Sequence, residues 1–279
     1  MTIERIAVTI PVQPWLADHC FNGKVVLPAV ETMLLLAAGV AGNHPEIDIR
    51  IMDNARFSRF LEIPPESSSV EVLIECRQNE DDSIHVKMLS RRQFKAMTRL
   101  QEHGEILFSP ARENHFCVPI LTSEPLADPE KEIPVEQVYR ELVPFGPSYH
   151  TLQETLYLCG QEAWGRLLAP VLGARDRVRQ LLGSPFPLDG AFHAACVLGQ
   201  RSADFVAFPV GFDRRIIVKP TQPGGSYCTR VQLLSQTRDE LLFDLQIFDD
   251  QGQIFESVTG LRMRNVNGVK IKLPEWMKR

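Results

Sequence analysis

The sequence lacks the features that mark exported, membrane-spanning and disulfide-stapled proteins. Its N-terminus, MTIERIAVTIPV, has no basic head followed by a long apolar run, so we expect no signal peptide. The longest apolar stretch, near residues 33–41, is far too short to span a bilayer. Six cysteines occur, but no two form a CxxC pair, and several lie in apolar runs. These absences predict a reduced, cytoplasmic protein with no disulfide framework and no membrane partner.

The sequence also lacks an excess of positive charge and the common metal-binding motifs. The net charge is −5, whereas a protein that coats nucleic acid normally presents a basic face, so no nucleic-acid partner is expected. No HExxH motif and no cluster of cysteine and histidine is present, so we expect no bound metal. What is present is ordinary for a globular protein: 279 residues, of which 44% are apolar and 23% are charged. This length is sufficient for two domains of usual size.

The first half, residues 1–110, combines strands with one apolar helix. Residues 5–12 alternate polar or small with apolar side chains, which is a strand pattern. Pro28 suits the first turn of a helix and Gly42 suits its end, and the residues between them are apolar on nearly all faces. Further segments rich in β-forming residues follow at 47–63, 70–78, 83–91 and 96–108.

Residues 111–134 are the predicted linker, because prolines and acidic residues are frequent there and no period holds. The second half, residues 135–279, repeats the order of elements. Residues 134–143 indicate a short helix, and residues 186–201 predict a second helix that is apolar on most faces. The predicted strands of this half are TLQETLYL, EAWGRLLAP, FVAFPVGFDRRIIV, YCTRVQLLS, LLFDLQIFDDQGQIF and ESVTGLRMRN.

In each half, one helix therefore precedes a run of strands. Because this helix is apolar on most faces, other elements must cover it on most sides. A sheet that curls around such a helix buries it, which is the hotdog arrangement. Two copies in one chain predict an α+β protein with a double hotdog fold, its two sheets side by side. Two unrelated α+β domains are the alternative.

His19, in the stretch DHCFNGKVVLP, is the first candidate catalytic residue. It lies ahead of a helix N-terminus, where free N–H groups and the helix dipole can hold a developing negative charge. Gly23 permits a ligand to approach the backbone closely. The unperturbed pKa of histidine, ~6.5, suits a general base near neutral pH. A loop histidine that only forms local hydrogen bonds is the alternative.

Asp189, in the stretch PLDGAFHAA, is the second candidate. It stands at the start of the second apolar helix, where aspartate is also a preferred N-cap residue. His193 follows four residues later and shares the same helix face. An Asp–His pair at this spacing could also bind a metal, but no metal-binding motif accompanies it.

These residues resemble the dehydratase domains of polyketide synthases and related fatty-acid synthases. HCFNGKVVLP, with His19, Gly23 and Pro28, fits the family motif HxxxGxxxxP. DGAFH, with Asp189 and His193, fits the second motif, Asp-x-x-x-Gln/His.

Two further elements extend the resemblance over nearly the whole chain. FGP at 145–147 looks like the family's YGP element, with Phe145 in place of Tyr, and FPVGFDRRIIV at 208–218 resembles its LPF-type strand. All four elements occur in the family's order. Phe145 removes a phenol hydroxyl that the family's pattern supplies, which puts the rate or selectivity of the site in doubt.

The resemblance implies one active site shared by the two halves of a double hotdog, with His19 facing Asp189. The substrate would be a β-hydroxyacyl thioester on the phosphopantetheine arm of an acyl carrier protein, in polyketide or fatty-acid biosynthesis. Loss of water would give the trans-α,β-enoyl thioester, and the protein itself would bind no cofactor. His19 would take the α-proton, Asp189 would protonate or orient the β-hydroxyl, and a backbone N–H near Gly23, or at the helix start behind it, would stabilise the carbonyl charge.

The charge state of Asp189 stays open, because a helix N-terminus lowers the pKa of a carboxyl and burial raises it. His193 would position this carboxylate. Other residues expected near the catalytic pair or along the substrate tunnel are Pro28, Phe145, Gly146, Pro147 and His150.

Partners and rival functions complete the prediction. The arginines of GARDRVRQ (173–180), at 175, 177 and 179, would suit an acidic carrier protein, although a solvated loop is the simpler interpretation. Other synthase subunits or a second copy of the chain, in a homodimer, are further partners left open. The rival functions are a product-template-like cyclase, an enoyl isomerase or a hydratase on the same fold, a non-catalytic double-hotdog domain, and a thioesterase.

Overall fold

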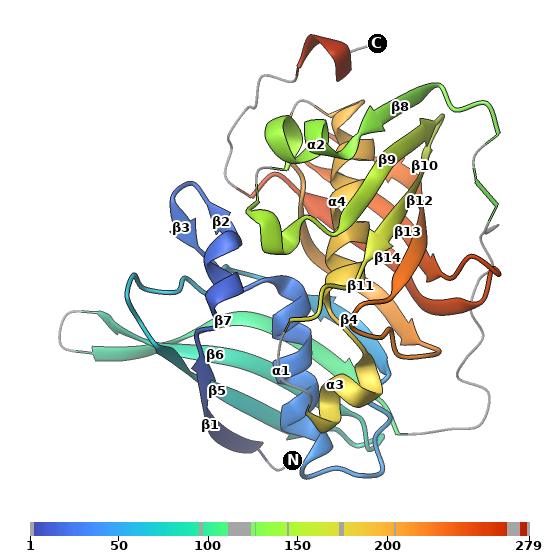
Figure 1. The fold of residues 1–279 in the computed structure, drawn as a ribbon. Helices are drawn as coiled ribbons and strands as arrows, with labels where there is room; N and C mark the ends of the chain where they lie inside the picture. Colours follow the sequence, from blue (N-terminus) through green and yellow to red (C-terminus); the bar gives the residue numbers. More distant parts are fainter. Residues whose placement is uncertain are drawn as a thin grey trace.

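Each half of the protein holds one apolar helix against an antiparallel sheet (Figure 1). The computed structural model describes residues 3–94, 97–110, 124–125, 127–143, 145–172, 176–203, 205–266 and 274–277. Helix α1 (Ala29–Ala41) follows Pro28, whose extended backbone makes it the N-cap residue. Helix α4 (Phe186–Gln200) is buried at every position, which explains why its sequence has no polar face. The two predicted apolar helices are confirmed.

The strands form a single twelve-stranded sheet in the order β1-β5-β6-β7-β4-β11-β14-β13-β12-β10-β9-β8, with every pairing antiparallel. In the first half the strands are β1 (Ile3–Pro11), β4 (Ile51–Arg56), β5 (Ser69–Gln78), β6 (Ile84–Phe94) and β7 (Met97–Phe108). In the second half they are β8 (Lys131–Pro134), β9 (Leu152–Cys159), β10 (Glu162–Leu168), β11 (Phe208–Ile217), β12 (Ser226–Gln236), β13 (Glu240–Phe248) and β14 (Ile254–Arg264).

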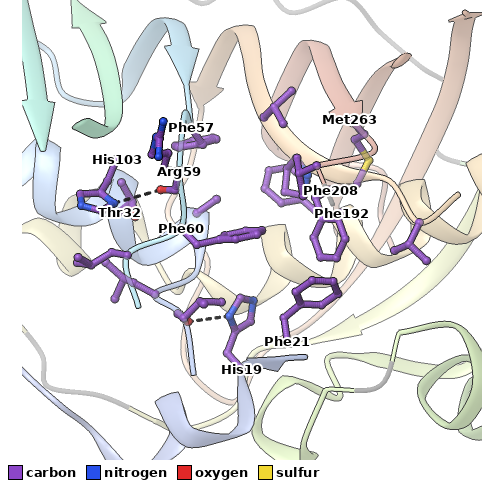
Figure 2. A pocket seen from close by; sticks show the side chains of 18 of the residues that line it. His19, Phe21, Thr32, Phe57, Arg59, Phe60, His103, Phe192, Phe208 and Met263 are labelled. Carbon is purple, nitrogen blue, oxygen red and sulfur yellow. Dashed lines mark hydrogen bonds between the residues drawn. The ribbon is translucent and has the colours of Figure 1, made fainter. Parts of the chain in front are cut away.

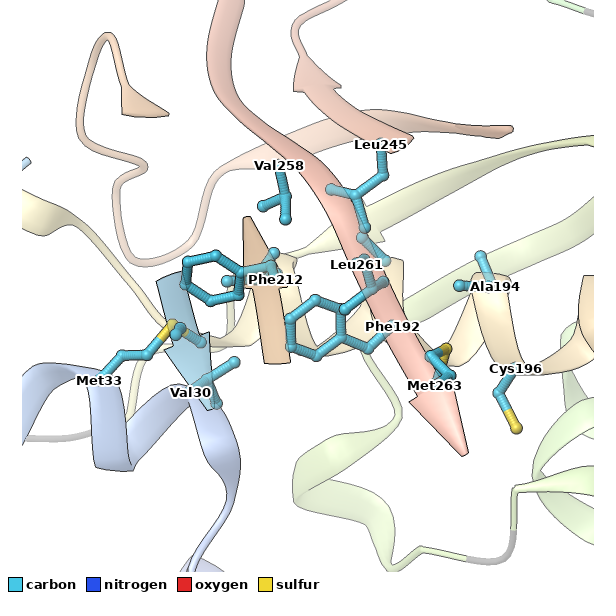
Figure 3. Close-up of a cluster of buried hydrophobic side chains, with 14 of the residues drawn as sticks. Val30, Met33, Phe192, Ala194, Cys196, Phe212, Leu245, Val258, Leu261 and Met263 are labelled. Carbon is cyan, nitrogen blue, oxygen red and sulfur yellow. The ribbon is translucent and has the colours of Figure 1, made fainter. Parts of the chain in front are cut away.

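The two halves join at the pairing of β4 with β11. The predicted pair of sheets lying side by side is therefore one continuous sheet, wrapped around two helices. A single core crosses this seam: Figure 3 shows Val30 and Met33 of α1 beside Phe212 of β11, with Phe192 of α4 next to them. No helix within the described ranges is long and apolar enough to cross a membrane.

Short elements connect the sheet to the helices. They are η1 (Pro14–Asp18), β2 (Cys20–Phe21), β3 (Lys24–Val25), α2 (Val135–Gln137), η2 (Val138–Leu142), η3 (Pro147–Tyr149), α3 (Arg177–Leu182) and η4 (Glu275–Met277). Helix α3 corrects the interpretation of residues 176–180 as a solvated loop, and residues 173–175 lie outside the described residues. Asp176 caps α3 by accepting a hydrogen bond from the Arg179 N–H, and the Arg179 guanidinium lies 2.7 Å from the buried Glu31 carboxylate of α1.

The short helix predicted over 134–143 is present as α2, which continues into the π-helical turn η2. Two other local expectations need correction. The predicted strand over 47–63 is limited to β4, and the segment after it turns toward the cavity described below. Residues 131–134, assigned to the linker, form β8 and pair with β9. Residues 111–123 and 126 of the predicted linker lie outside the described residues, so the domain boundaries stay a prediction.

Candidate active site

A cavity of about 520 Å³ is lined by residues from both halves of the chain. From the first half it takes His19, residues 20–22 of the β2–β3 hairpin, the start of α1 and residues 57–62. From the second half it takes Phe145, the segment that enters β11, and four side chains of α4, namely Asp189, Phe192, His193 and Cys196. His19 and Asp189, 170 positions apart (189 − 19), therefore face one enclosed space.

The imidazole of His19 is held with one nitrogen occupied. His19 ends the 3-10 helix η1, and its Nδ1 lies 2.8 Å from the carbonyl oxygen of Val26. A carbonyl only accepts hydrogen bonds, so Nδ1 carries the hydrogen and Nε2 keeps its lone pair. The Val26 N–H in turn donates to the His19 carbonyl at 3.1 Å. These two bonds fix both the tautomer and the position of the ring.

Aromatic rings and burial complete the environment of His19. Phe145 stacks on the imidazole with ring centroids 4.4 Å apart, and Tyr149 lies at 5.0 Å. Burial lowers the pKa of His19, and the negative charge of Asp189 partly opposes this shift. The neutral form is thus favoured, as a base requires.

Asp189 lies one turn inside α4, so the N-cap interpretation is wrong. The helix begins at Phe186, and the Asp189 N–H already bonds to the Pro185 carbonyl at 3.2 Å. Asp189 as a residue is 5% exposed, and its Oδ2 has no hydrogen-bond partner within the described residues. The His193 Nε2 is 3.2 Å from this oxygen, but the geometry does not make a hydrogen bond. Both atoms are therefore buried with unused hydrogen-bonding capacity beside the cavity.

A tyrosine that the sequence analysis did not single out orients His193. The hydroxyl of Tyr139 accepts a hydrogen bond from the Leu152 N–H at 2.8 Å and lies 3.3 Å from the Nδ1 of His193. Since the hydroxyl already accepts from Leu152, its own hydrogen is available to Nδ1. The His193 hydrogen then sits on Nε2, on the side of Asp189. No third metal-ligating side chain joins this pair in the described part of the chain.

Gly23 and Pro28 of the first motif shape the backbone and do not line the cavity. Asn22 and Gly23 both have positive φ, 49° and 75°, which is typical of the two-residue turn of a tight hairpin and explains the Asn-Gly pair. Pro28 is the N-cap of α1. The expectation that His19 directly precedes a helix needs adjustment: the β2–β3 hairpin intervenes, and the first turn of α1 reaches the cavity through Ala29 and Thr32.

The FGP element brings only its phenylalanine to the cavity. The Gly146 N–H donates to the carbonyl of Asp18 at 2.8 Å, and a Cβ at Gly146 would collide with the Asp18 side chain. Pro147 starts η3. His150 is exposed, stacks on Tyr139 at 4.1 Å and bonds to the Phe145 carbonyl at 2.9 Å. Gly146 thus ties the second half to Asp18 next to His19, whereas the contacts of His150 lie within the second half, and none of Gly146, Pro147 and His150 lines the cavity.

Aromatic residues from both halves line the cavity wall. Most of them lie outside the sequence motifs, so the sequence did not predict them as site residues. Phe21 of the hairpin packs edge-on against Phe208 of β11, with centroids 4.5 Å apart, and Phe60 lies 5.8 Å from Phe208. Figure 2 shows Phe208, Phe192 and Met263 on one side of His19. The sequence pattern around these aromatic residues is compatible with strands. Only the fold shows that their side chains point into the cavity.

His103 is a second buried histidine at the cavity. Its Nε2 lies 2.7 Å from the Ser90 hydroxyl, and its Nδ1 lies 3.3 Å from the Arg59 carbonyl. Burial lowers its pKa. Because both nitrogens have protein partners, this ring anchors the segment after β4 to β7.

Comparisons with known proteins identify the family of this chain and its fold. The family model described as polyketide synthase dehydratase N-terminal domain matches residues 119–270, and the model described as polyketide synthase dehydratase domain matches residues 6–91. Polyketide synthase ThaG of Burkholderia thailandensis is 24% identical over 262 residues, which is 90% of this chain and 4% of that synthase.

Two similar solved structures show the same fold over nearly the whole chain. The dehydratase domain from the CurJ module of curacin polyketide synthase has a TM-score of 0.72 at 20% identity, covering 96% of this chain and 94% of its own. A trans-AT polyketide synthase dehydratase domain from Brevibacillus brevis has a TM-score of 0.70 at 18% identity, covering 95% and 94%. The predicted double hotdog is thereby confirmed. The chain belongs to the polyketide synthase dehydratase domain family.

Proposed function

We propose that this chain is a hydro-lyase that removes water from a β-hydroxyacyl thioester carried on the phosphopantetheine arm of an acyl carrier protein. The product is the trans-α,β-enoyl thioester. The observation that supports this most is the single cavity that His19 of the first half and Asp189 of the second half both line. Neither half alone holds both groups.

His19 acts as the base. Its Nε2 has a lone pair because Nδ1 donates to the Val26 carbonyl. The ring is neutral near pH 7 because burial lowers its pKa. The α-proton of the substrate, acidified by the thioester carbonyl, moves to Nε2, and the electron pair of the C–H bond becomes the new double bond as the β-hydroxyl leaves.

Asp189 serves the leaving hydroxyl. Its buried Oδ2, free of protein hydrogen bonds within the described residues, can donate a proton to the hydroxyl or hold the hydroxyl by accepting from it. In the second case the proton on His19 Nε2 passes to the hydroxyl, and water leaves with the same balance of atoms. His193 Nε2–H lies beside Asp189 and supports the charged carboxylate.

The carbonyl charge that develops during proton removal needs N–H donors. Gly23 does not line the cavity, whereas Ala29 at the start of α1 does. The first turn of a helix leaves its N–H groups without intrahelical partners. We therefore assign the oxyanion site to the first turn of α1, where one donor is typically worth about 3 kcal/mol.

The decisive experiment incubates the protein with a 3-hydroxybutyryl thioester on an acyl carrier protein and follows the mass by spectrometry. A loss of one water mass is expected. His19→Ala should lower kcat by at least about 100-fold, as removal of a general base typically does. Asp189→Asn should also cause a large loss of kcat, while His44→Ala, a partly exposed histidine outside the cavity, should retain activity.

The rival reactions other than a hydratase give different masses from the same assay. A cyclase or an isomerase leaves the 3-hydroxybutyryl thioester at its original mass, and a thioesterase releases free acid from the carrier. A hydratase catalyses the reverse reaction, so it is recognised by starting from the enoyl thioester and measuring which direction is faster. Full activity of His19→Ala would contradict the assignment of the base, and no change in any substrate would favour a non-catalytic domain.

A further inference from the structure

One end of the cavity is positively charged. Arg59, which follows β4, and Arg92 of β6 both line the cavity, and both side chains are exposed. Figure 2 shows Arg59 together with His103 and Phe57, while Phe192 and Phe208 lie on the opposite side of the cavity, with Phe60 between the two groups and His19 below it. A ligand that fills the cavity would therefore meet Arg59 at one end and Phe192 and Phe208 at the other, and would pass His19 on the way.

The two arginines are available to a ligand. Neither guanidinium makes an ion pair within the described residues. The nearby carboxylates are already engaged: Glu62, which also lines the cavity, lies 2.9 Å from Lys24, and Glu102 lies 2.6 Å from Lys87. His103 is already bonded to the Ser90 hydroxyl and the Arg59 carbonyl, and burial lowers its pKa.

The register of β6 and β7 concentrates positive charge at this end. Arg92 lies directly opposite Arg99 of β7, so both side chains stand on the same face of the hairpin. The next pair on this face is Ser90 with Gln101, and Gln101 lines the cavity.

We propose that Arg59 and Arg92 bind the phosphate of the phosphopantetheine arm, while the acyl chain occupies the aromatic end of the cavity. The proposal rests on the proposed function. A guanidinium matches phosphate oxygens with parallel N–H donors, which makes arginine a preferred phosphate ligand. The apolar acyl chain is best desolvated among aromatic side chains. With the phosphate at the arginines and the acyl chain at the aromatic end, the thioester that joins the arm to the acyl chain lies beside His19.

The stretch 173–180 fits this role less well. Arg179 is bound to the buried Glu31 and lies 3.6 Å from Asp176. Arg177 does not line the cavity, and Arg175 lies outside the described residues. Docking of the carrier protein on this stretch stays a prediction, whereas the phosphate of the arm is assigned to Arg59 and Arg92.

The test compares two free thioesters that differ only in the phosphate: 3-hydroxybutyryl-pantetheine and 3-hydroxybutyryl-phosphopantetheine. At low ionic strength the wild type should prefer the phosphorylated thioester about tenfold or more in kcat/KM, and added salt should reduce the preference. In the double variant Arg59→Gln/Arg92→Gln the preference should fall to near one. Arg77→Gln, an exposed arginine on β5 away from the cavity, should keep the wild-type preference.

Equal kcat/KM for the two thioesters in the wild type would overturn the proposal while leaving the dehydration intact. An unchanged preference in the double variant would also overturn it. If the wild type consumes neither thioester, the dehydration fails, and calorimetric titration with phosphopantetheine and pantetheine decides the phosphate site alone. Tighter binding of phosphopantetheine by the wild type but not by the double variant supports the site, and equal binding refutes it.

Discussion

The surroundings of His19 set the pH range in which the proposed base works. Burial lowers the pKa of its imidazole, and the charge of Asp189 raises it by a smaller amount. The base is the neutral form, which predominates above the folded-state pKa. Since that pKa lies below the ordinary value of about 6.5, we expect kcat/KM to remain constant down to about pH 6.5 and to fall only in more acidic solution.

An NMR titration measures the pKa of the His19 imidazole directly, without enzyme turnover. In the wild type the imidazole should titrate below about 6.5, the ordinary histidine value. In Asp189→Asn the pKa should move further down, because the carboxylate that favours the imidazolium is gone while the burial remains. A pKa at or above the ordinary value, or an upward shift in the variant, would contradict this account of the site.

Tyr139 links the fold to the orientation of His193. Tyr139→Phe removes the acceptor of the Leu152 N–H and the partner of the His193 Nδ1 while keeping the ring. A buried donor left without a partner costs about 1–3 kcal/mol, so the urea midpoint should fall accordingly. Tyr157→Phe, on β9 outside the cavity, is the matched control and should change stability by less. Equal stabilities of the Tyr139 variant and the wild type would show that this hydroxyl is not needed.

At the scale of elements, a buried ion pair holds β11 against β14 at the seam of the halves. Arg215 Nε lies 2.7 Å from Glu256 Oε1, and both side chains are at most 3% exposed. The Arg215 Nη1 also contacts the sulfurs of Met33 and Met52, at 3.4 and 3.7 Å. One guanidinium therefore touches α1 and β4 of the first half and β14 of the second.

Breaking this pair from one side leaves a buried charge uncompensated. Arg215→Met should lower the free energy of unfolding by about 3–5 kcal/mol, whereas Arg215→Met with Glu256→Leu should recover much of the loss. The exposed pair Arg264–Glu240 on the same sheet is the control, and its loss should cost at most about 1 kcal/mol. Chemical denaturation of the wild type and these three variants measures the differences. A single Arg215→Met change that costs no more than the exposed pair would contradict this interpretation.

Elements with strong periodicity were predictable, and those decided by contacts between the halves were not. Helices α1 and α4 and most strands follow from apolar pattern and from Pro28 and Gly42. The strand predicted over 47–63 was too long, because the segment after β4 is held by His103 and the cavity and not by a neighbouring strand. Nothing local marks Tyr139 or Arg59 as site residues. Their positions depend on long-range pairing, which periodicity does not report.

The site itself divides in the same way. The motifs predicted His19, Asp189, His193 and Phe145, and the fold brings all four to one cavity. Gly23 was expected near the substrate because glycine permits close approach, but its positive φ and place in a hairpin account for it fully. A motif glycine can thus be required for the tight turn that positions the histidine. The sequence alone does not separate this role from close contact with the substrate.

At the scale of the whole molecule, the two halves depend on each other. Removing residues 135–279 would expose the edge of β4, whose partner is β11, and the face of α1 that packs on Phe212. An exposed strand edge beside uncovered apolar side chains favours aggregation over folding. We expect residues 1–110 produced alone to show no cooperative unfolding transition, because half of their core would be missing.

Co-production of residues 1–110 with residues 127–279 tests this dependence directly. The fragments should associate through β4 and β11 into a complex with one cooperative transition, and only the complex should hold His19 and Asp189 in one cavity. Ala55→Pro within β4 is the control, because Ala55 lies opposite Phe212 and proline removes a backbone donor from the strand, so the complex should weaken. Cooperative unfolding of residues 1–110 alone would show instead that each hotdog is a self-sufficient domain, and that the shared cavity forms by docking two finished folds.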